Sequence, residues 1–570
     1  MKNTTCSSKN MSAKLSVTGV VALFIAGCTI HPHNISDEEK SAIFLKDQTE
    51  MFSQQETISH PLTLEEAMAR AVKYNLSGRL AVMRKALEKR LLDSKSYELL
   101  PSVASSAGWR TRDKLAASSS ESLETGTQSL EPSTSQDKKL RNADLSLSWN
   151  ILDFGIGYFG ARIQANNVLA ANEQRRAVIA DIIQQVRSAY WAAATAQDLE
   201  PGVKAILAEA KEALKKARQT EIERLIAPVD AMRYQKSLLK MISQLENLSA
   251  ELINAKTQLA TLMNIAPTTP YTLASIGESG TKLPKVNYSL ENLESLAMIN
   301  RPEINEEVYK ARNAVLETRS QLTHLLPGAS LFVGTHYDSN SYLVNQNWAD
   351  AGVQVSWNLM NVFSYSSVKN AGEAKEKVAE IRRQALRMAV LTQVNVAWHQ
   401  YHQSQNQYKN ATELLRLQNG IEAQTRHAYQ SSMKSRLEQI RMKTETVLIT
   451  RHRDQQLAKA QSSLGAIYQA AGLDPLPEQI QNQSIKALTL AIAQKRVRLL
   501  NGELSQQQPP LLTKIPPFVT ETFLPSVSEK TIPESRTVIS ESPDYVSTFE
   551  NLGSLKATII RDYTTSAKYE

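Results

Sequence analysis

SLSWNIL, at residues 146–152, returns as VSWNLM at residues 355–360. Around each copy, apolar side chains alternate with polar ones, which is the period of a β-strand with one apolar face. The predicted apolar faces consist of Leu145, Leu147, Trp149 and Ile151 in the first copy and of Val353, Val355, Trp357 and Leu359 in the second. A weaker alternating segment precedes each copy, and the first of these contains Trp109. We therefore predict four strands, at about residues 101–112, 142–152, 328–338 and 351–360.

The duplication extends beyond the strands. Thr63 and Ser289, like Pro101 and Pro327, are 226 positions apart, whereas Trp149 and Trp357, like Pro267 and Pro475, are 208 apart. One insertion of 18 residues accounts for the change from 226 to 208, and the Ser-rich stretch 112–141 of the first copy is where it fits. A fixed offset held at several anchors indicates two repeats of helix, strand, strand, long helix and helix.

Two very long helical patterns follow the strand pairs. From residue 155 to 219 only Pro201 and Gly202 interrupt the pattern, and the equivalent run from 368 to 429 has no proline. At 1.5 Å per residue, the first run is about 95 Å long. Such a helix exceeds the size of a globular domain, so we expect it to pack as a coiled coil or in the wall of a tube. Pro201 is expected to kink this helix or to divide it into two.

The composition argues against an enzyme and against nucleic-acid binding. The 570 residues include only 20 Gly and 6% aromatic residues, and the formal charge of +8 is spread along the predicted helices rather than clustered. The nine His are scattered; His399 and His402 share a helix face that we interpret as solvated. No catalytic constellation or nucleotide-binding loop is present in the sequence, so we predict no catalytic residue, no cofactor and no metal site.

The N-terminus resembles a lipoprotein signal. Lys14 precedes a short apolar run that ends in small residues before Cys28, and this run is too short to span a bilayer. Residues 25–28, IAGC, resemble a bacterial lipobox, in which Cys28 becomes the acylated first residue of the mature protein. Thr29 then implies sorting to the outer membrane. The alternative is an ordinary signal that contains a cysteine, and the start codon is either Met1 or Met11.

These observations divide the chain into six segments. The predicted segments are a signal peptide at 1–27, a lipidated linker at 28–60, the first repeat at 61–270, a linker at 271–287, the second repeat at 288–477 and a C-terminal extension at 478–570. Thr63 and Glu66 form a capping-box pattern that predicts a helix at the start of the first repeat. Apolar residues then recur at helical spacing, at Leu80, Met83 and Leu87. The extension is rich in Pro, Ser and Thr beyond Ser505, which predicts disorder after one further helix near 484–500.

Four strands cannot close a barrel alone, because the smallest single-chain outer-membrane barrels use about eight. An open sheet edge in lipid leaves backbone groups unpaired, at a cost of several kcal/mol each. If the apolar faces meet lipid, the strands must therefore join those of other copies. The alternative is a soluble hairpin packed on helices, which shows the same alternation.

Five short motifs together resemble the TolC-like outer membrane factors, in their lipoprotein form. The motifs are TLEEA at 63–67, LLP at 99–101, SWN at 148–150, DFG at 153–155 and NRPEI at 300–304. The resemblance covers about residues 60–477. It implies a mainly α fold with a small β part, in which a homotrimer forms a transmembrane β-barrel continued by a long periplasmic α-helical barrel. It also implies contact with outer-membrane lipid, a periplasmic adaptor and a proton-driven or ATP-driven inner-membrane pump.

The resemblance also implies a periplasmic gate near the turn between the second long helix and the helix after it. Tyr429, Lys434 and Glu438 match aromatic, basic and acidic gate positions of the family, and Asp230 is the first-repeat equivalent of Glu438. Arg441 stands where the family has a second acid. Our hypothesis is that Lys434, Arg436 or Arg441 pairs with Glu438 or Asp230 across neighbouring hairpins.

The predicted function is a passive outer-membrane duct that conducts drugs, metals or other small molecules in a tripartite export system. A duct for type I secretion of proteins or peptides differs from it only in the partner. A second alternative, a lipid-tethered periplasmic coiled-coil scaffold, explains the helices and Cys28 but not the alternating strands.

Overall fold

The computed structural model describes residues 33–53, 55–129, 131–223, 227–267, 269–277, 281–283, 285–431, 435–473 and 483–503. These residues belong to one compact unit, which spans residues 1–510. The predicted signal peptide, Cys28, Lys434 and the chain beyond residue 503 lie outside the described residues.

The helices repeat in matched pairs. The first repeat contains α3 (Leu64–Tyr74), α4 (Leu76–Tyr97), α5 (Ile151–Ile222) and α6 (Pro228–Leu262), of 11, 22, 72 and 35 residues. The second contains α8 (Leu290–Asn300), α9 (Pro302–Thr323), α10 (Asn361–Gln430) and α11 (Arg436–Ala470), of 11, 22, 70 and 35 residues. Among the described residues, no helix is both long enough and apolar enough to cross a lipid bilayer.

Four strands form one antiparallel sheet in the order β1-β4-β5-β6. They are β1 (Ser102–Thr111), β4 (Lys139–Asn150), β5 (Gly328–Asp338) and β6 (Asn347–Ser356). The loop between β1 and β4 is longer than that between β5 and β6 and carries a small hairpin, β2 (Ala117–Ser118) and β3 (Ser133–Thr134). The extra length of the first copy therefore lies in this loop.

Three residues of the predicted apolar faces lie outside the strands. Ile151 is the first residue of α5, because the Asn150 side chain accepts hydrogen bonds from the amides of Leu152 (2.9 Å) and Asp153 (3.4 Å) and so starts the helix. Trp357 and Leu359 follow the end of β6. The indole N–H of Trp357 donates to the carbonyl oxygen of Leu325 at 3.0 Å. This bond fixes the Trp357 side chain to the turn between α9, which ends at Thr323, and β5.

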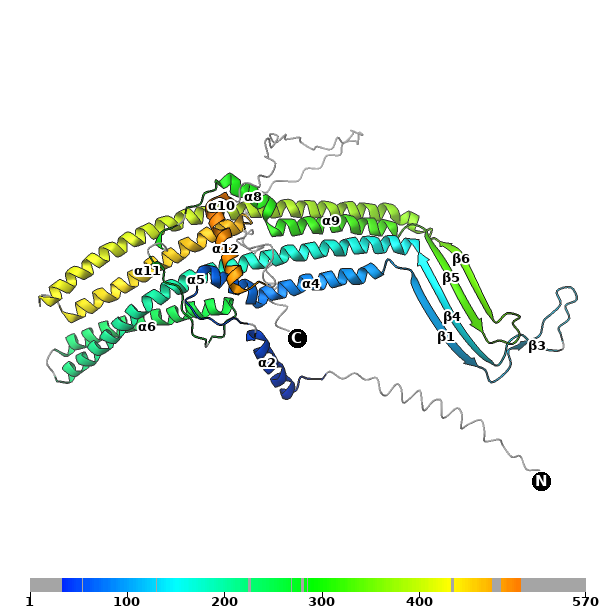
Figure 1. Cartoon of the computed structure of the whole chain (residues 1–570), viewed down its shortest axis with the longest axis horizontal. Coiled ribbons are helices and arrows are strands. Elements are labelled where there is room, and N and C mark those ends of the chain that lie inside the picture. Colours follow the sequence, from blue (N-terminus) through cyan, green and yellow to red (C-terminus); the bar gives the residue numbers. More distant parts are fainter. Residues whose placement is uncertain are drawn as a thin grey trace, which may run out of the picture. The chain divides into compact units, whose positions relative to one another are not determined.

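Each strand of the sheet is continued by one long helix. The chain passes from α4 to β1, from β4 to α5, from α9 to β5 and from β6 to α10, with few or no residues between. The helices pack in the sequence α4, α5, α9, α10, which is the order of the strands to which they are joined. Figure 1 shows these four helices and four strands side by side. We call this arrangement the wall.

Helix α5 continues through Pro201, which excludes the division that was one of the two outcomes expected there. Proline has no N–H, so the carbonyl of Gln197 loses its usual intrahelical donor. The flanking Leu199 and Val203 are both buried in the largest apolar core of the chain. The Gln197 side chain is also fixed, because it donates to the carbonyl of Leu273 and accepts from its amide, both at 2.9 Å. Packing on both sides of the proline thus holds the helix together.

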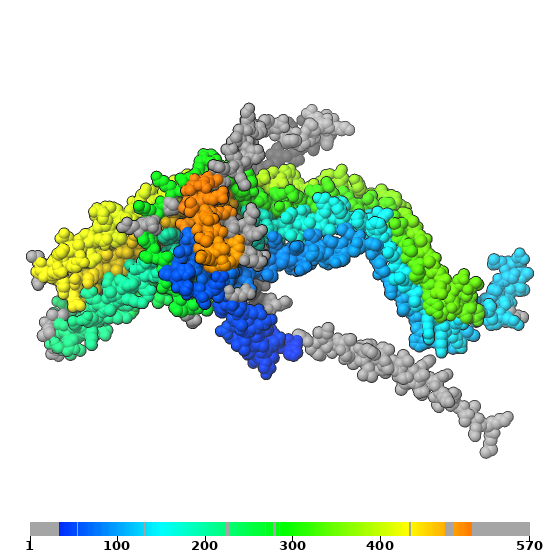
Figure 2. Space-filling view, viewed as in Figure 1, coloured from blue at the N-terminus to red at the C-terminus, as the bar shows by residue number. Residues whose placement is uncertain are grey.

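A short layer of helices covers the middle of the wall, and we call it the belt. It consists of α3, α8 and α12 (Ile485–Leu500), and α12 lies on the molecular surface beside α3 (Figure 2). Helix α12 occupies almost the range predicted for a further helix after the second repeat. Its apolar side chains Leu488 and Ile492 are fully buried in the core shared with α3 and α5.

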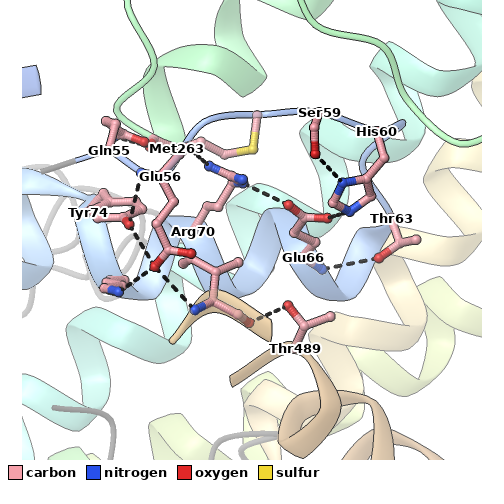
Figure 3. A network of polar contacts seen from close by, with 12 residues as sticks. Gln55, Glu56, Ser59, His60, Thr63, Glu66, Arg70, Tyr74, Met263 and Thr489 are labelled. Atoms are coloured by element: carbon pink, nitrogen blue, oxygen red, sulfur yellow. Dashed lines mark hydrogen bonds and ion pairs between the residues drawn. The ribbon is translucent and has the colours of Figure 1, made fainter. Parts of the chain in front are cut away.

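A buried ion pair within α3 is the centre of a network that joins the belt to the N-terminal segment (Figure 3). Arg70 and Glu66 of α3 are 2% and 4% exposed, and their side chains meet at 3.0 Å. Arg70 also donates to the carbonyl oxygen of Glu56, while His60 contacts the second carboxylate oxygen of Glu66 at 2.9 Å. The Glu56 carboxylate accepts from Lys73, which lowers the pKa of Glu56, and from the first amide of α12.

The start of α3 differs in one respect from the capping box predicted there. Thr63 does cap the helix, since its hydroxyl accepts from the amide of Glu66 at 3.3 Å. The Glu66 carboxylate, however, turns to Arg70 and His60. In a capping box the Glu66 carboxylate would accept from the amide of Thr63. Here the buried ion pair takes the place of that bond.

Replacing Arg70 with Met is expected to destabilise the protein by about 3–5 kcal/mol, because Glu66 is left as an uncompensated buried charge. The double variant Arg70→Met/Glu66→Leu should recover most of this loss. Thermal unfolding of the detergent-purified protein measures both. The control is Lys40→Met, which breaks an exposed pair with Asp37 (2.9 Å) and should cost less than about 1 kcal/mol. Equal effects of the two single variants would contradict the assignment.

Candidate functional site

The register of the sheet gathers the predicted apolar side chains on one face. Trp149 pairs with Leu331, which pairs with Val353, and Leu147 lies between Val103 and Val333. Residues directly opposite each other in an antiparallel sheet project to the same side. The apolar face includes Val103, Trp109, Leu145, Leu147, Trp149, Leu331, Val333, Tyr337, Val353 and Val355, all of them exposed. No described element of the chain covers this face.

The opposite face of the sheet is polar. It carries Ser102, Ser106, Asn142, Asp144, Ser146, Ser148, Ser330, His336, Asp350 and Gln354, with Phe332 and Trp348 among them. His336 was not singled out in the sequence, because its role depends on strand register. The sheet therefore has one side suited to lipid and one suited to water.

Both edges of the wall are unpaired. Strands β1 and β6 each have a neighbour on one side only. The adjoining helices carry exposed apolar stripes at helical spacing: Leu76, Leu80, Met83, Leu87 and Leu91 on α4, and Val378, Ile381, Met388 and Val396 on α10. We call these the α4 stripe and the α10 stripe. The α4 stripe has the spacing of side chains that pack in a core, yet no described element of the chain covers it.

Beyond the belt, two helical hairpins lie side by side. Helices α5 and α6 form the first hairpin, α10 and α11 form the second, and α11 packs against α5. Ile440 of α11 is fully buried among Ala210, Ala213 and Leu238 of the first hairpin. The small alanine side chains on α5 allow the three helices to approach closely, so the hairpins move against each other only if this packing changes.

Two ion pairs connect the hairpins near their tips. Lys443 of α11 lies 2.8 Å from Glu209 of α5, and Arg436 lies 3.9 Å from Glu212. The pKa of Glu212 is lowered by its hydrogen bond to Lys216 and further by the charge of Arg436. The sequence did not predict the partners Glu209, Glu212 and Lys443. Acidic and basic residues more than two hundred positions apart leave no local pattern that would show they are in contact.

The predicted gate residues lie at these tips. Tyr429 is in the last turn of α10, and Glu438 and Arg441 are in the first turns of α11. Asp230, in the first turn of α6, faces Arg233 of its own helix at 3.7 Å. Within one chain, Arg436 thus pairs with Glu212 instead of Glu438 or Asp230. The structure does not describe Lys434.

Buried charges mark the place where α5, α6 and α11 meet. Asp454 of α11 is 6% exposed and lies 2.9 Å from Arg453, while Arg451 pairs with Glu251 of α6. Burial raises the pKa of Asp454 to about 6, although the charges of Arg453 and Arg451 oppose the shift. Asp198 of α5 adds a repulsive charge that raises the pKa further.

The described residues contain no group of three or more His, Cys, Asp or Glu side chains arranged to hold a metal ion. The arrangement that stands out is geometric: a two-faced sheet with open edges, continued by long helices that end in two linked hairpins.

No protein-family model and no curated protein matches this chain. Solved structures do match. The Campylobacter jejuni CmeC outer membrane channel is similar over 82% of this chain and 98% of its own, with a TM-score of 0.58 and 15% identity. The chain has the TolC-like outer membrane channel fold. The open-state Neisseria gonorrhoeae MtrE channel (72% of this chain, 89% of its own, TM-score 0.55, 17% identity) and Vibrio cholerae VceC (72%, 97%, 0.53, 14%) share the TolC-like fold. The resemblance predicted from the motifs is confirmed at the level of the fold.

The raised pKa of Asp454 predicts how stability depends on pH. Between the unfolded pKa near 3.8 and the folded pKa of about 6, the folded protein binds more protons, so its stability falls as pH rises through this window and stays lower above it. Asp454→Asn should therefore stabilise the protein at pH 7.5, by about 1–3 kcal/mol per chain, and by less at pH 5.

Thermal unfolding at the two pH values measures this difference. Asp93→Asn, which alters an exposed carboxylate of α4, serves as the control and should show nearly the same small effect at both pH values. A stabilisation by Asp454→Asn that does not depend on pH would contradict the interpretation.

Proposed function

We propose that this protein is the outer-membrane duct of a tripartite export system, through which small molecules such as drugs or metals pass passively. The observation that carries the proposal is the wall: its sheet and its helices have the same two open edges. Because both edges are open along the sheet and the helices, copies of the wall can join edge to edge. Copies arranged around one axis then enclose a continuous bore.

Three copies are the number that the resemblance implies and that the geometry accommodates. Each chain supplies four strands, so three supply twelve, an even number within the range of outer-membrane barrels. The edge β1 with α4 of one copy meets the edge β6 with α10 of the next. Such a contact joins two different surfaces, and it closes into a ring if the rotation per copy allows. The α4 and α10 stripes are buried at this contact.

Lipidation of Cys28 fits the length of the N-terminal segment. Helix α2 (Asp37–Phe52) is tied at its end to the turn that follows α6, where Asn264 donates to the carbonyl of Met51 at 2.7 Å. From there α2 covers about 24 Å, and the nine residues back to Cys28 reach at most about 30 Å more. Helix α4, which separates the belt from β1, is about 33 Å long. An acyl chain on Cys28 can therefore reach the inner leaflet in which the strands begin.

The hairpin tips form the gate in this proposal. The pairs Lys443–Glu209 and Arg436–Glu212 hold the second hairpin against the first, and Asp230, Glu438 and Arg441 lie at the tips, where neighbouring copies converge. Each partly exposed pair contributes less than about 1 kcal/mol. Six pairs in a trimer make a latch that a periplasmic adaptor can release reversibly. The energy for export comes from the inner-membrane pump.

Secretion of proteins or peptides requires the same duct, and the partner pump decides between the two cargoes. A periplasmic scaffold is disfavoured by the uncovered apolar face of the sheet, which would be exposed to water.

Electron microscopy of the purified protein tests the proposal directly: a hollow particle with threefold symmetry is expected. A monomer that stays in solution without detergent after removal of its acyl group would overturn it.

Charges on the α4 stripe are expected to disrupt assembly. The double variant Met83→Glu/Leu87→Glu places two carboxylates in the contact between copies, and the trimer should dissociate in detergent. Light scattering coupled to size-exclusion chromatography measures the mass. Lys89→Glu changes the net charge by the same amount at an exposed position off the stripe and should leave the trimer intact. Dissociation of both variants, or of neither, would count against this contact.

Charge reversal at the hairpin pairs is expected to open the gate. Glu209→Lys/Glu212→Lys makes the first hairpin repel Lys443 and Arg436, so single-channel conductance in planar bilayers should rise severalfold. Glu246→Lys is the matched control, because Glu246 pairs with Lys211 (2.7 Å) inside the first hairpin and connects nothing across. Asp230→Lys/Glu438→Lys tests the contact between copies. If conductance is unchanged in all three variants, the latch lies elsewhere.

A further inference from the structure

A network of charged side chains crosses the polar face of the sheet. Nδ1 of His336, on β5, lies 2.8 Å from Oδ1 of Asp144 on β4. Nε2 of the same ring lies 3.2 Å from Oδ1 of Asp350 on β6. The hydroxyl of Ser106, on β1, donates to Oδ2 of Asp144 at 2.9 Å. Side chains of all four strands are thereby joined at one level of the sheet.

The surrounding backbone leaves space for this network. Gly334 is opposite Asp350 in the register, and a Cβ at Gly334 would lie 2.7 Å from Nε2 of His336 and 3.0 Å from Oδ1 of Asp350. Trp348, directly opposite His336, stacks on the imidazole with ring centres 5.3 Å apart and planes at 19°. The ring is therefore held in the plane in which each nitrogen points at a carboxylate.

This geometry suits the protonated form of the ring. A neutral imidazole has one N–H donor, and ionised carboxylates accept only, so two carboxylate partners are satisfied together only when both nitrogens carry protons. The network then has a net charge of −1, and it changes to −2 when the ring loses a proton. The other charged residues of this face, within the described strands, are Arg110 and Asp338, and no contact joins either to His336.

We propose that Asp144, His336 and Asp350 form a titratable acidic ring around the bore of the barrel, which makes the duct favour cations over anions and does so more strongly as the pH rises. The inference rests on the proposed duct function, because three copies must close before these side chains encircle a bore. Histidine is the side chain that most readily exchanges a proton near neutral pH, so the charge of the ring responds to the pH outside the cell. Fixed charges that line a pore favour ions of the opposite sign.

The experiment measures ion selectivity of the full-length protein in planar bilayers. Under a gradient of KCl, the reversal potential gives the ratio of K⁺ to Cl⁻ permeability. The pH is changed from 5 to 8 only on the side of the bilayer that faces the β1–β4 and β5–β6 loops. The groups at the hairpin tips, on the other side, then stay at constant pH. For the wild type, the ratio should rise on the order of twofold, because the charge of each network doubles.

Three variants separate the network from other charges. His336→Gln should abolish the step and hold the ratio at pH 5 near the wild-type value at pH 8. Asp144→Asn/Asp350→Asn should lower the ratio at both pH values. Asp338→Asn removes an acid of the same face outside the network, so it should lower the ratio slightly and leave the step intact.

Two results would overturn the inference while leaving the duct intact: wild-type channels with the same ratio at both pH values, or a step that persists in His336→Gln. Failure of the wild type to form channels at all would instead remove the duct function, and the inference would fall with it.

Discussion

The unpaired backbone groups along β1 and β6 are the constraint on which the rest of the structure depends. Hydrogen-bond donors and acceptors on a sheet edge need partners, and within lipid water cannot supply them. Among the described residues, the only strands outside the order β1-β4-β5-β6 are the two-residue β2 and β3, which pair with each other. In the proposed duct, the sheet can therefore enter lipid only together with the sheets of sister chains.

The helices inherit their arrangement from the sheet. Asn150 is the last residue of β4 and also caps α5, so strand and helix are continuous. The same holds, with short turns, for the other three junctions, and the order of strands becomes the order of helices. An open sheet edge therefore lies beside an open helix edge, and the apolar α4 and α10 stripes cover the length that the strands do not. The belt braces this wall from one side by means of α12 and the Glu66–Arg70 pair.

Local patterns in the sequence determined much of the fold in advance. Alternation around Trp149, the duplicated anchors and the proline-free second long helix predicted the elements and their repetition. The ends of the strands were harder to predict, because a residue such as Asn150 is compatible both with a strand and with the cap of a helix. Pro201 does not divide α5 as one of the two alternatives had it, because packing of Leu199 and Val203 outweighs the loss of one hydrogen bond. The partners of Arg436 and the contacts of His336 depend on register between distant segments, which no local pattern encodes.

The unbroken course of α5 and α10 has a mechanical consequence. Both rods are fixed at one end by the sheet and in the middle by the belt, whereas the hairpins beyond the belt are held mainly by each other. With 35 residues each, α6 and α11 give these hairpins a lever arm of about 52 Å. A tilt of about 5° at the fulcrum then displaces a tip by about 4–5 Å. In the proposed duct, small adjustments at this fulcrum are therefore amplified into a change of aperture at the hairpin tips.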